Sequence, residues 1–162
     1  MSAFQEIVTE GKLEVGESSI PVFRLANNRK AFEQQAFYYF LKRKKIKENL
    51  GYFLGLSRLR KYLPKSFLER KDIIGKRDDE LIPILLTEEV LYILNALINA
   101  ALQKDLGQTW TIAYENAQLL LLAFANEGIS ATVDRAIEEN PPMSIKRFNE
   151  VMKRIIVFTF KN

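Results

Sequence analysis

The sequence of 162 residues contains no cysteine and no histidine. Without cysteine there is no disulfide, no thiolate nucleophile and no zinc–thiolate site. Without histidine the chain lacks the commonest general base, the Ser–His and Cys–His catalytic pairs and the commonest metal ligand. We therefore expect a protein that is not an enzyme, with no catalytic residue, no metal site and no cofactor.

Long apolar runs are also missing. None approaches the roughly 20 residues that a membrane-spanning helix needs. Residues 1–6 have neither the basic start nor the apolar stretch of a secretory signal. Absent cysteine suits a reducing compartment. We expect a cytoplasmic protein with no membrane partner.

What the chain does contain is enough apolar material for one core. The apolar fraction is 48%, including 11 Phe and 6 Tyr. A chain of this length buries most of its apolar surface without the help of disulfides. No linker or repeat divides it, so residues 1–162 are expected to form a single domain.

Strands are expected near the N-terminus, where short apolar segments alternate around turn residues. The segments are 4–8, 11–15 and 20–25, with a turn at 16–19. A last β-like segment, 155–160, is a candidate to close the same sheet. The sequence thus predicts a small antiparallel sheet of N-terminal strands, with the C-terminal strand as a possible addition.

Helices are expected over most of the remaining chain. Asn28 is the predicted N-cap of a helix starting at Arg29 or Lys30, and Thr87 the predicted cap of a later one. Gly128 is the predicted C-cap of a helix over 111–126, and 72–83 is expected to be a loop. The other predicted helices are 50–62, 87–102, 131–139 and 144–153. The fold class expected is therefore α+β, a mainly helical domain with a small sheet.

Charge is distributed unevenly along the chain. Residues 28–77 hold fifteen Lys or Arg against four acids, an excess of +11. The remainder holds nine basic and sixteen acidic residues, an excess of −7, so the net charge is +4. A basic segment of this density favours a polyanionic partner.

The predicted site is this basic segment, residues 29–77, acting on nucleic acid, with DNA favoured over RNA. Lysine and arginine bind phosphate by displacing condensed counterions, and tyrosines near the run can stack on unpaired bases. The aromatic candidates are Tyr38, Tyr39, Tyr52 and Phe53. The candidate nucleic-acid-binding residues are Arg29, Lys30, Lys42, Arg43, Lys44, Lys45, Lys47, Arg58, Arg60, Lys61 and Lys65. A solvated helix face is the alternative explanation of the run, and no helix-turn-helix or zinc-finger motif is present.

Several phrases resemble a family of phage and plasmid antirepressor-like proteins with a P-sixty-three-C-type domain. The resemblance covers about residues 9–137. Its phrases are Gly11-Lys12-Leu13, Ile20-Pro21-Val22, Asn27-Asn28-Arg29, Leu63-Pro64 with Phe67, Ile82-Pro83 leading a helix, and Ala117 to Leu120 followed by Phe124-Ala125, Gly128-Ile129, Ala131 and Val133-Asp134-Arg135-Ala136. The resemblance implies a phage- or plasmid-derived transcription regulator and no particular reaction.

Two further features leave alternatives open. The acids 78–80 and 88–89 offer oxygen ligands for Mg²⁺, but adjacent acids on a helix point to different faces, so a solvated surface is the simpler explanation. The run 119–124 is apolar around a whole helix, which predicts either a central core helix or one that meets a second copy of the chain. The leading hypothesis is a nucleic-acid-associated regulator, with homo-oligomerisation left open. The alternative is a protein-interaction or scaffold module whose basic face meets an acidic regulatory protein.

Overall fold

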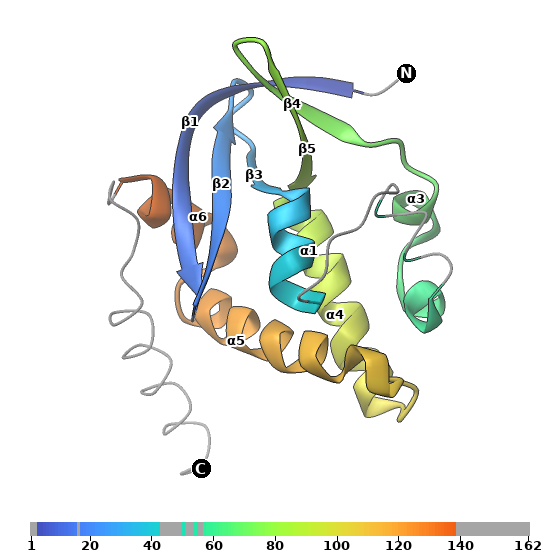
Figure 1. Ribbon diagram of the computed structural model, residues 1–162. Coiled ribbons are helices and arrows are strands. Elements are labelled where there is room, and N and C mark those ends of the chain that lie inside the picture. The colour runs from blue at the N-terminus through green and yellow to red at the C-terminus, as the bar shows by residue number, and fades with distance from the viewer. Residues whose placement is uncertain (1–2, 16, 43–49, 51–53, 55–56, 139–162) are drawn as a thin grey trace.

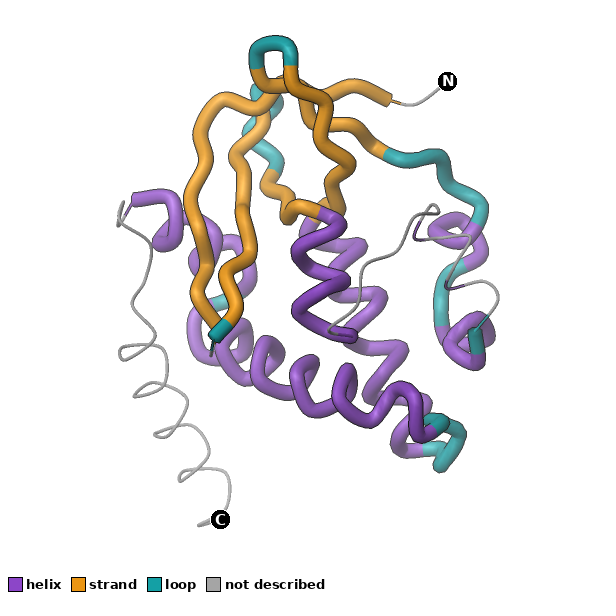
Figure 2. Tube along the Cα trace, viewed as in Figure 1, coloured by secondary structure: helices purple, strands orange, loops and turns teal. Residues whose placement is uncertain are grey.

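A computed structural model describes residues 3–15, 17–42, 50, 54 and 57–138. Helix makes up about 53% and strand about 30% of these residues. The strands gather in one half of the molecule and the helices lie below and beside them (Figures 1 and 2).

Five strands form a closed barrel in the order β1-β2-β3-β5-β4. Their bounds are β1 Ala3–Val15, β2 Ser18–Leu25, β3 Lys30–Glu33, β4 Ile73–Arg77 and β5 Glu80–Leu86. Neighbouring strands run antiparallel except at the seam, where Ala3–Glu6 of β1 pairs in parallel with Ile73–Lys76 of β4. The register of β1 shifts between Ile7 and Thr9, which leaves Val8 bulged and exposed.

The strands separate two apolar clusters because side chains alternate between the two faces of a sheet. The inside of the barrel is filled by Ile7, Phe23, Leu25, Ala31, Ile82, Ile84 and Leu86. Gly75 also faces inward, and a Cβ there would lie 2.7 Å from Ile7 Cδ1. The larger cluster lies outside the barrel, where Leu13, Val22 and Phe32 pack against the helices.

Helices α1 (Gln34–Lys42) and α4 (Thr87–Leu102) pack against the barrel, and α6 (Ile129–Glu138) lies along β1 and β2. Helix α5 (Thr111–Glu127) packs mainly on these helices. Two short 3₁₀ helices, η1 (Arg58–Tyr62) and η2 (Gln108–Trp110), and the short helix α3 (Lys65–Leu68) complete the described helices. Phe32 meets both Phe37 and Phe124 edge-to-face at about 6 Å, which ties β3 to α1 and α5.

The expectation of a mainly helical domain with a small open sheet is wrong, because the sheet closes on itself. Two local misreadings contributed. Residues 72–83, expected to be a loop, are mostly the β4–β5 hairpin, with Asp78 in a tight turn at φ 52°. Residues 30–33, expected to begin a helix, form β3. Asn28 is a turn residue at φ 66° rather than a helix cap, and α1 begins at Gln34.

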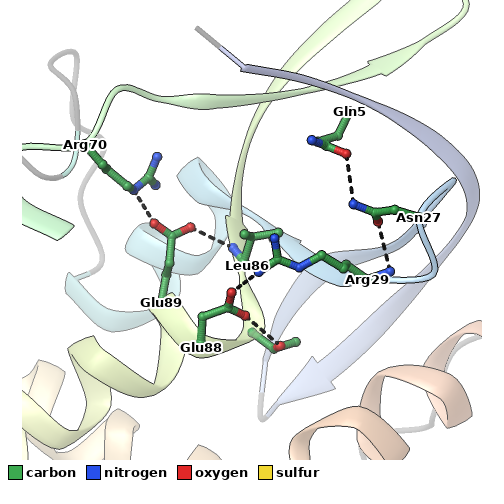
Figure 3. Close-up of polar contacts among 8 residues, drawn as sticks. Gln5, Asn27, Arg29, Arg70, Leu86, Glu88 and Glu89 are labelled. Atoms are coloured by element: carbon green, nitrogen blue, oxygen red, sulfur yellow. Dashed lines mark hydrogen bonds and ion pairs between the residues drawn. The ribbon is translucent and has the colours of Figure 1, made fainter. Parts of the chain in front are cut away.

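Helix ends agree with the sequence in one place and differ in another. Gly128 ends α5 at φ 85° and ψ 148°, and its N–H donates to the Phe124 carbonyl, as a C-cap requires. At the start of α4 the cap position is Leu86, not Thr87, and the Glu89 carboxylate accepts from the Leu86 N–H at 3.0 Å (Figure 3). The predicted helix 144–153 and strand 155–160 lie outside the described residues.

The apolar run of α5 is covered within the chain. Leu120 is fully buried, whereas Leu119, Leu121 and Leu122 are half-buried and pack against the outer core. The buried side of the run belongs to the core, and contact of its half-buried side with a second copy of the chain stays a prediction.

Candidate functional site

The first two predicted cations hold the fold together. Arg29, in the β2–β3 turn, pairs with Glu88 at the first turn of α4 (Figure 3). Lys30 Nζ lies 3.0 Å from Asp134 Oδ2 on α6, and Arg24 Nη2 lies 2.8 Å from the other carboxylate oxygen. The side chain of Lys30 is only 16% exposed, so it has little surface to offer a partner.

Three other predicted cations converge on the connection between α4 and α5. Lys42, the last residue of α1, donates to the Thr109 carbonyl, and its ammonium lies 3.8 Å from the centre of the Trp110 ring. The Arg58 guanidinium lies beside Gly107, and Lys61 pairs with Asp105. Residues 105–110 therefore contact both the last residue of α1 and side chains of η1, so that these cations lie on one part of the surface.

We call this surface the basic end, defined by Lys42, Arg58, Arg60, Lys61 and Lys104. Arg58, Arg60, Lys61 and Lys104 are exposed. Lys104 belongs to the connection itself, with φ 58°. The sequence analysis missed Lys104 because it lies in the acidic remainder of the chain. Of these five cations, Lys61 pairs with the carboxylate of Asp105, and the charge of Arg58 also acts on it.

Asp105 is held by its neighbours in the charged form. Lys61 first and then the Tyr62 hydroxyl, which donates at 3.1 Å, lower the pKa of this carboxyl. The hydrogen bond that Lys61 donates to Asp105 in turn raises the pKa of the Lys61 ammonium. Both groups are ionised near neutral pH, and the basic end keeps an excess of positive charge.

Of the remaining candidate nucleic-acid-binding residues, one is exposed and the others lie outside the described residues. Lys65, on α3, is 85% exposed and lies 3.7 Å from Glu69 one helical turn away. Arg43, Lys44, Lys45 and Lys47 follow Lys42 directly and lie outside the described residues, as do Tyr52 and Phe53. Tyr38 is buried, so of the described stacking candidates Tyr39, 45% exposed, is the one with a free face.

Much of the charge that separates along the sequence is brought back together by folding. The pairs are Arg29 with Glu88, Lys30 with Asp134, Lys61 with Asp105, Lys65 with Glu69, Arg70 with Glu89, and Arg77 with both Glu10 and Glu80. All these acids except Glu69 lie outside residues 28–77. Acids from the rest of the chain therefore neutralise part of the +11 excess of residues 28–77 in the folded protein.

Three of the five acidic residues considered as a Mg²⁺ site take part in these pairs. Glu80, Glu88 and Glu89 each pair with an arginine. Over the described part of the chain, no three carboxylates are grouped so as to hold a metal ion.

A second candidate site, which the sequence analysis did not find, is a cavity of about 680 Å³ in the barrel. It is lined by Glu10, Gly11, Lys12, Pro21, Phe23, Glu33, Arg77, Glu80, Leu81, Ile82, Pro83 and Ala136. Burial, and secondarily the charge of Glu80, raise the pKa of Glu33. Charged residues at inward-facing strand positions, such as Glu33, Arg77 and Glu80, could have indicated this cavity. The sequence analysis did not find it because it assigned residues 30–33 to a helix and 72–83 to a loop.

No family model, no curated protein and no solved structure matches the chain. Among the described residues, none of the helices is long and apolar enough to span a bilayer.

Proposed function

We propose that the protein is a non-catalytic, cytoplasmic regulatory protein that binds nucleic acid, DNA in preference to RNA, through the basic end. The observation that carries the proposal is the convergence of Lys42, Arg58 and Lys61 on residues 105–110. Cations from separate elements at one exposed place are suited to neighbouring phosphates. The resemblance to phage and plasmid antirepressor-like proteins supports a regulatory role.

The proposal is narrower than the sequence alone suggested. Arg29 and Lys30 are left out of the basic end, because they pair with Glu88 at the start of α4 and with Asp134 on α6, whereas the basic end lies at the other end of α4. The run Arg43, Lys44, Lys45 and Lys47 continues from Lys42 and is assigned to the interface by its position in the sequence. Tyr39, three residues before Lys42 on α1, is the stacking candidate nearest in sequence.

The test is a salt titration of binding to short unrelated DNA duplexes and RNA strands, read by fluorescence anisotropy. The wild-type protein should lose affinity steeply between about 50 mM and about 200 mM salt. The variant Arg58→Glu with Arg60→Glu should bind more weakly, and its salt slope on duplex DNA should fall by about 2, since each lost phosphate contact removes about 0.9.

The matched control is Lys71→Glu with Lys76→Glu, which reverses the same number of charges at exposed positions away from the basic end. It should keep most of the affinity and the slope. Equal weakening by the two double variants would mean that net charge alone drives binding and that the basic end is not the interface. Absence of salt-dependent binding by the wild-type protein to any DNA or RNA would end the proposal.

An acidic protein partner is the second candidate. The observation that favours it is that cations of residues 28–77 already pair with carboxylates at many places in the fold. A carboxylate-rich partner would extend the same chemistry. Salt-dependent binding of poly-glutamate, with no binding of nucleic acid, would select this candidate.

A further inference from the structure

The wall of the barrel opens where β3 ends. Strand β3 has four residues, and its last pair joins Glu33 to Ile84 of β5. Beyond that pair, β5 continues to Glu80 and β2 continues back to Ser18, and none of the described strands lies between them. The cavity lies at this opening, between Pro21 of β2 on one side and Leu81 and Pro83 of β5 on the other.

The two prolines indicate that the opening does not take up another strand. Pro21 and Pro83 lie just past the last β3 pairs of their strands, on the two edges that β3 leaves uncovered. Proline has no N–H to donate, and proline on an edge prevents pairing with an added strand. The opening is therefore built to remain a cavity, which favours a small ligand over an extended peptide.

Alternation along the strands explains the chemistry of the cavity. Phe23 and Ile82 belong to the inner cluster and form an apolar floor. Glu33, Arg77 and Glu80 lie two residues beyond inward-facing positions on β3, β4 and β5, so they face the same interior at its open end. Apolar surface with a few convergent polar groups, at the mouth of a barrel, is the usual form of a small-molecule site, and the volume is in the usual range.

One charge in this cavity is not compensated. Arg77 pairs with Glu10 and with Glu80, the latter at 2.6 Å between Nη2 and Oε2. Lys12 is exposed at the rim, and no described cation pairs with Glu33. The five ionisable groups of the lining thus leave one negative charge, and Glu33 is the half-buried carboxylate without a partner. The raised pKa of Glu33 agrees with an uncompensated charge at a partly desolvated position.

We propose that the cavity binds a small organic cation, an ammonium or guanidinium group on an apolar stem. Glu33 pairs with the cation, while Phe23 and Ile82 contact the stem. The site is independent of the basic end, because no residue of the basic end lines the cavity. Its success or failure therefore leaves the nucleic-acid proposal untouched.

The experiment is an NMR titration of amide resonances with four probes of equal stem length: butylguanidinium, butylammonium, neutral butanol and anionic butyrate. Saturable shifts at Phe23, Glu33 and Ile82 with the two cations, and weak or no shifts with butanol and butyrate, are expected. Glu33→Gln should weaken butylguanidinium binding by about tenfold or more, the cost of losing a charged hydrogen bond.

The matched control is Glu115→Gln, which removes one negative charge at an exposed position of α5 and should leave butylguanidinium binding unchanged. Glu33→Asp keeps the charge but moves the carboxylate back by one methylene, and should give intermediate affinity. Glu33→Gln should fold normally, since it removes a half-buried carboxylate without a partner, and a thermal melt checks this.

Each other outcome overturns the proposal. Equal binding of butanol and butylguanidinium to the wild-type protein would make the cavity an apolar site without charge recognition. Equal weakening by Glu33→Gln and Glu115→Gln would reduce the effect to net charge. No cavity shifts with either cation would show that the opening takes no such group, whether or not the variants fold.

Discussion

Gly11 of β1 lies directly against the carbonyl of Ala136 on α6. A Cβ built on Gly11 would be 2.4 Å from that oxygen and 2.7 Å from the Ile137 Cα. Both contacts are to backbone, which has no flexible end that can move aside. The contact at this point of the barrel wall therefore requires glycine, and it fixes how closely α6 approaches β1.

Gly11→Ala should accordingly destabilise the fold by about 1 to 3 kcal/mol, since overpacking a tight contact forces backbone to shift. Urea unfolding measures the change. Gly107→Ala is the control, because a Cβ there would have the Arg58 guanidinium at 3.8 Å, an ordinary contact. It should stay within about 0.5 kcal/mol of wild type. Similar losses from both substitutions would argue against the close approach of α6.

Asp134 should make stability depend on acid pH. Burial alone would raise its pKa, but hydrogen bonds from Arg24 and Lys30 outweigh burial and lower the pKa. A carboxyl whose pKa is lower in the folded protein stabilises the fold above its unfolded pKa of about 3.9 and loses this effect as pH falls through the folded value.

Asp134→Asn should therefore reduce the free energy of unfolding by roughly 0.5 to 1 kcal/mol near neutral pH, a small value because the group is a third exposed. The difference from wild type should shrink below about pH 4. Asp79→Asn, in the exposed β4–β5 turn, serves as the control and should change little. A difference that persists undiminished in acid would contradict the ion-pair explanation.

The pair of Arg70 and Glu89 should matter more than any exposed pair. Their side chains are 11% and 7% exposed, and Glu89 also accepts from the Leu86 N–H (Figure 3). Burial raises the pKa of Glu89, and Arg70 opposes this. Glu89→Ala leaves the buried Arg70 with Asp72, 4.0 Å away, as its remaining described carboxylate, and should cost about 3 kcal/mol, the lower end for a broken buried pair.

Replacing both members with methionine should recover much of that loss, because it removes the uncompensated charge. Glu69→Ala removes the exposed partner of Lys65 and should cost less than about 0.5 kcal/mol. Thermal and urea unfolding compare the three variants. A double variant as unstable as Glu89→Ala would show that packing, not the buried charge, is responsible.

Substitution of Gly128 should destabilise the fold because of its backbone conformation alone. No atom lies within 4 Å of a Cβ built there, so space is not limiting. Its φ of 85° and ψ of 148° belong to a region used almost exclusively by glycine. Gly128→Ala should cost roughly 1 to 3 kcal/mol. Gly128→Asn should bring no recovery, because asparagine tolerates the left-handed helical region and not this one.

The elements that could be predicted from the sequence are those determined by residues close to one another in the chain. The apolar helices α4 and α5 and the cap at Gly128 depend on near neighbours, and their positions were predicted closely, whereas Ser18 and Ser19 of the predicted turn belong to β2. Phe32 fits the periodicity of a helix with Phe37 and Phe40, so β3 was misread. The charges of 76–80 hid a hairpin, because β4 ends at Arg77 and β5 begins at Glu80, within the charged run.

The site was harder to predict because it depends on distant pairings. The sequence identified Lys42, Arg58 and Lys61 as cations, but not that residues 105–110 would bring them together. It also counted Lys30 as free, whereas its acid partner, Asp134, is about a hundred residues away. The cavity follows from the closure of the barrel, which no local pattern encodes.

The parallel seam between β1 and β4 determines when the barrel can exist. Ala3–Glu6 must wait for Ile73–Lys76, so the first strand to leave the ribosome is among the last to find both neighbours. At roughly 5 to 20 residues per second, the delay is several seconds. During that time β1 has one free edge, and its hairpin partner β2 is the only shield. A nascent chain stalled before β4 would present Ala3–Glu6 of this edge to other chains, whereas in the folded barrel β4 pairs with these residues.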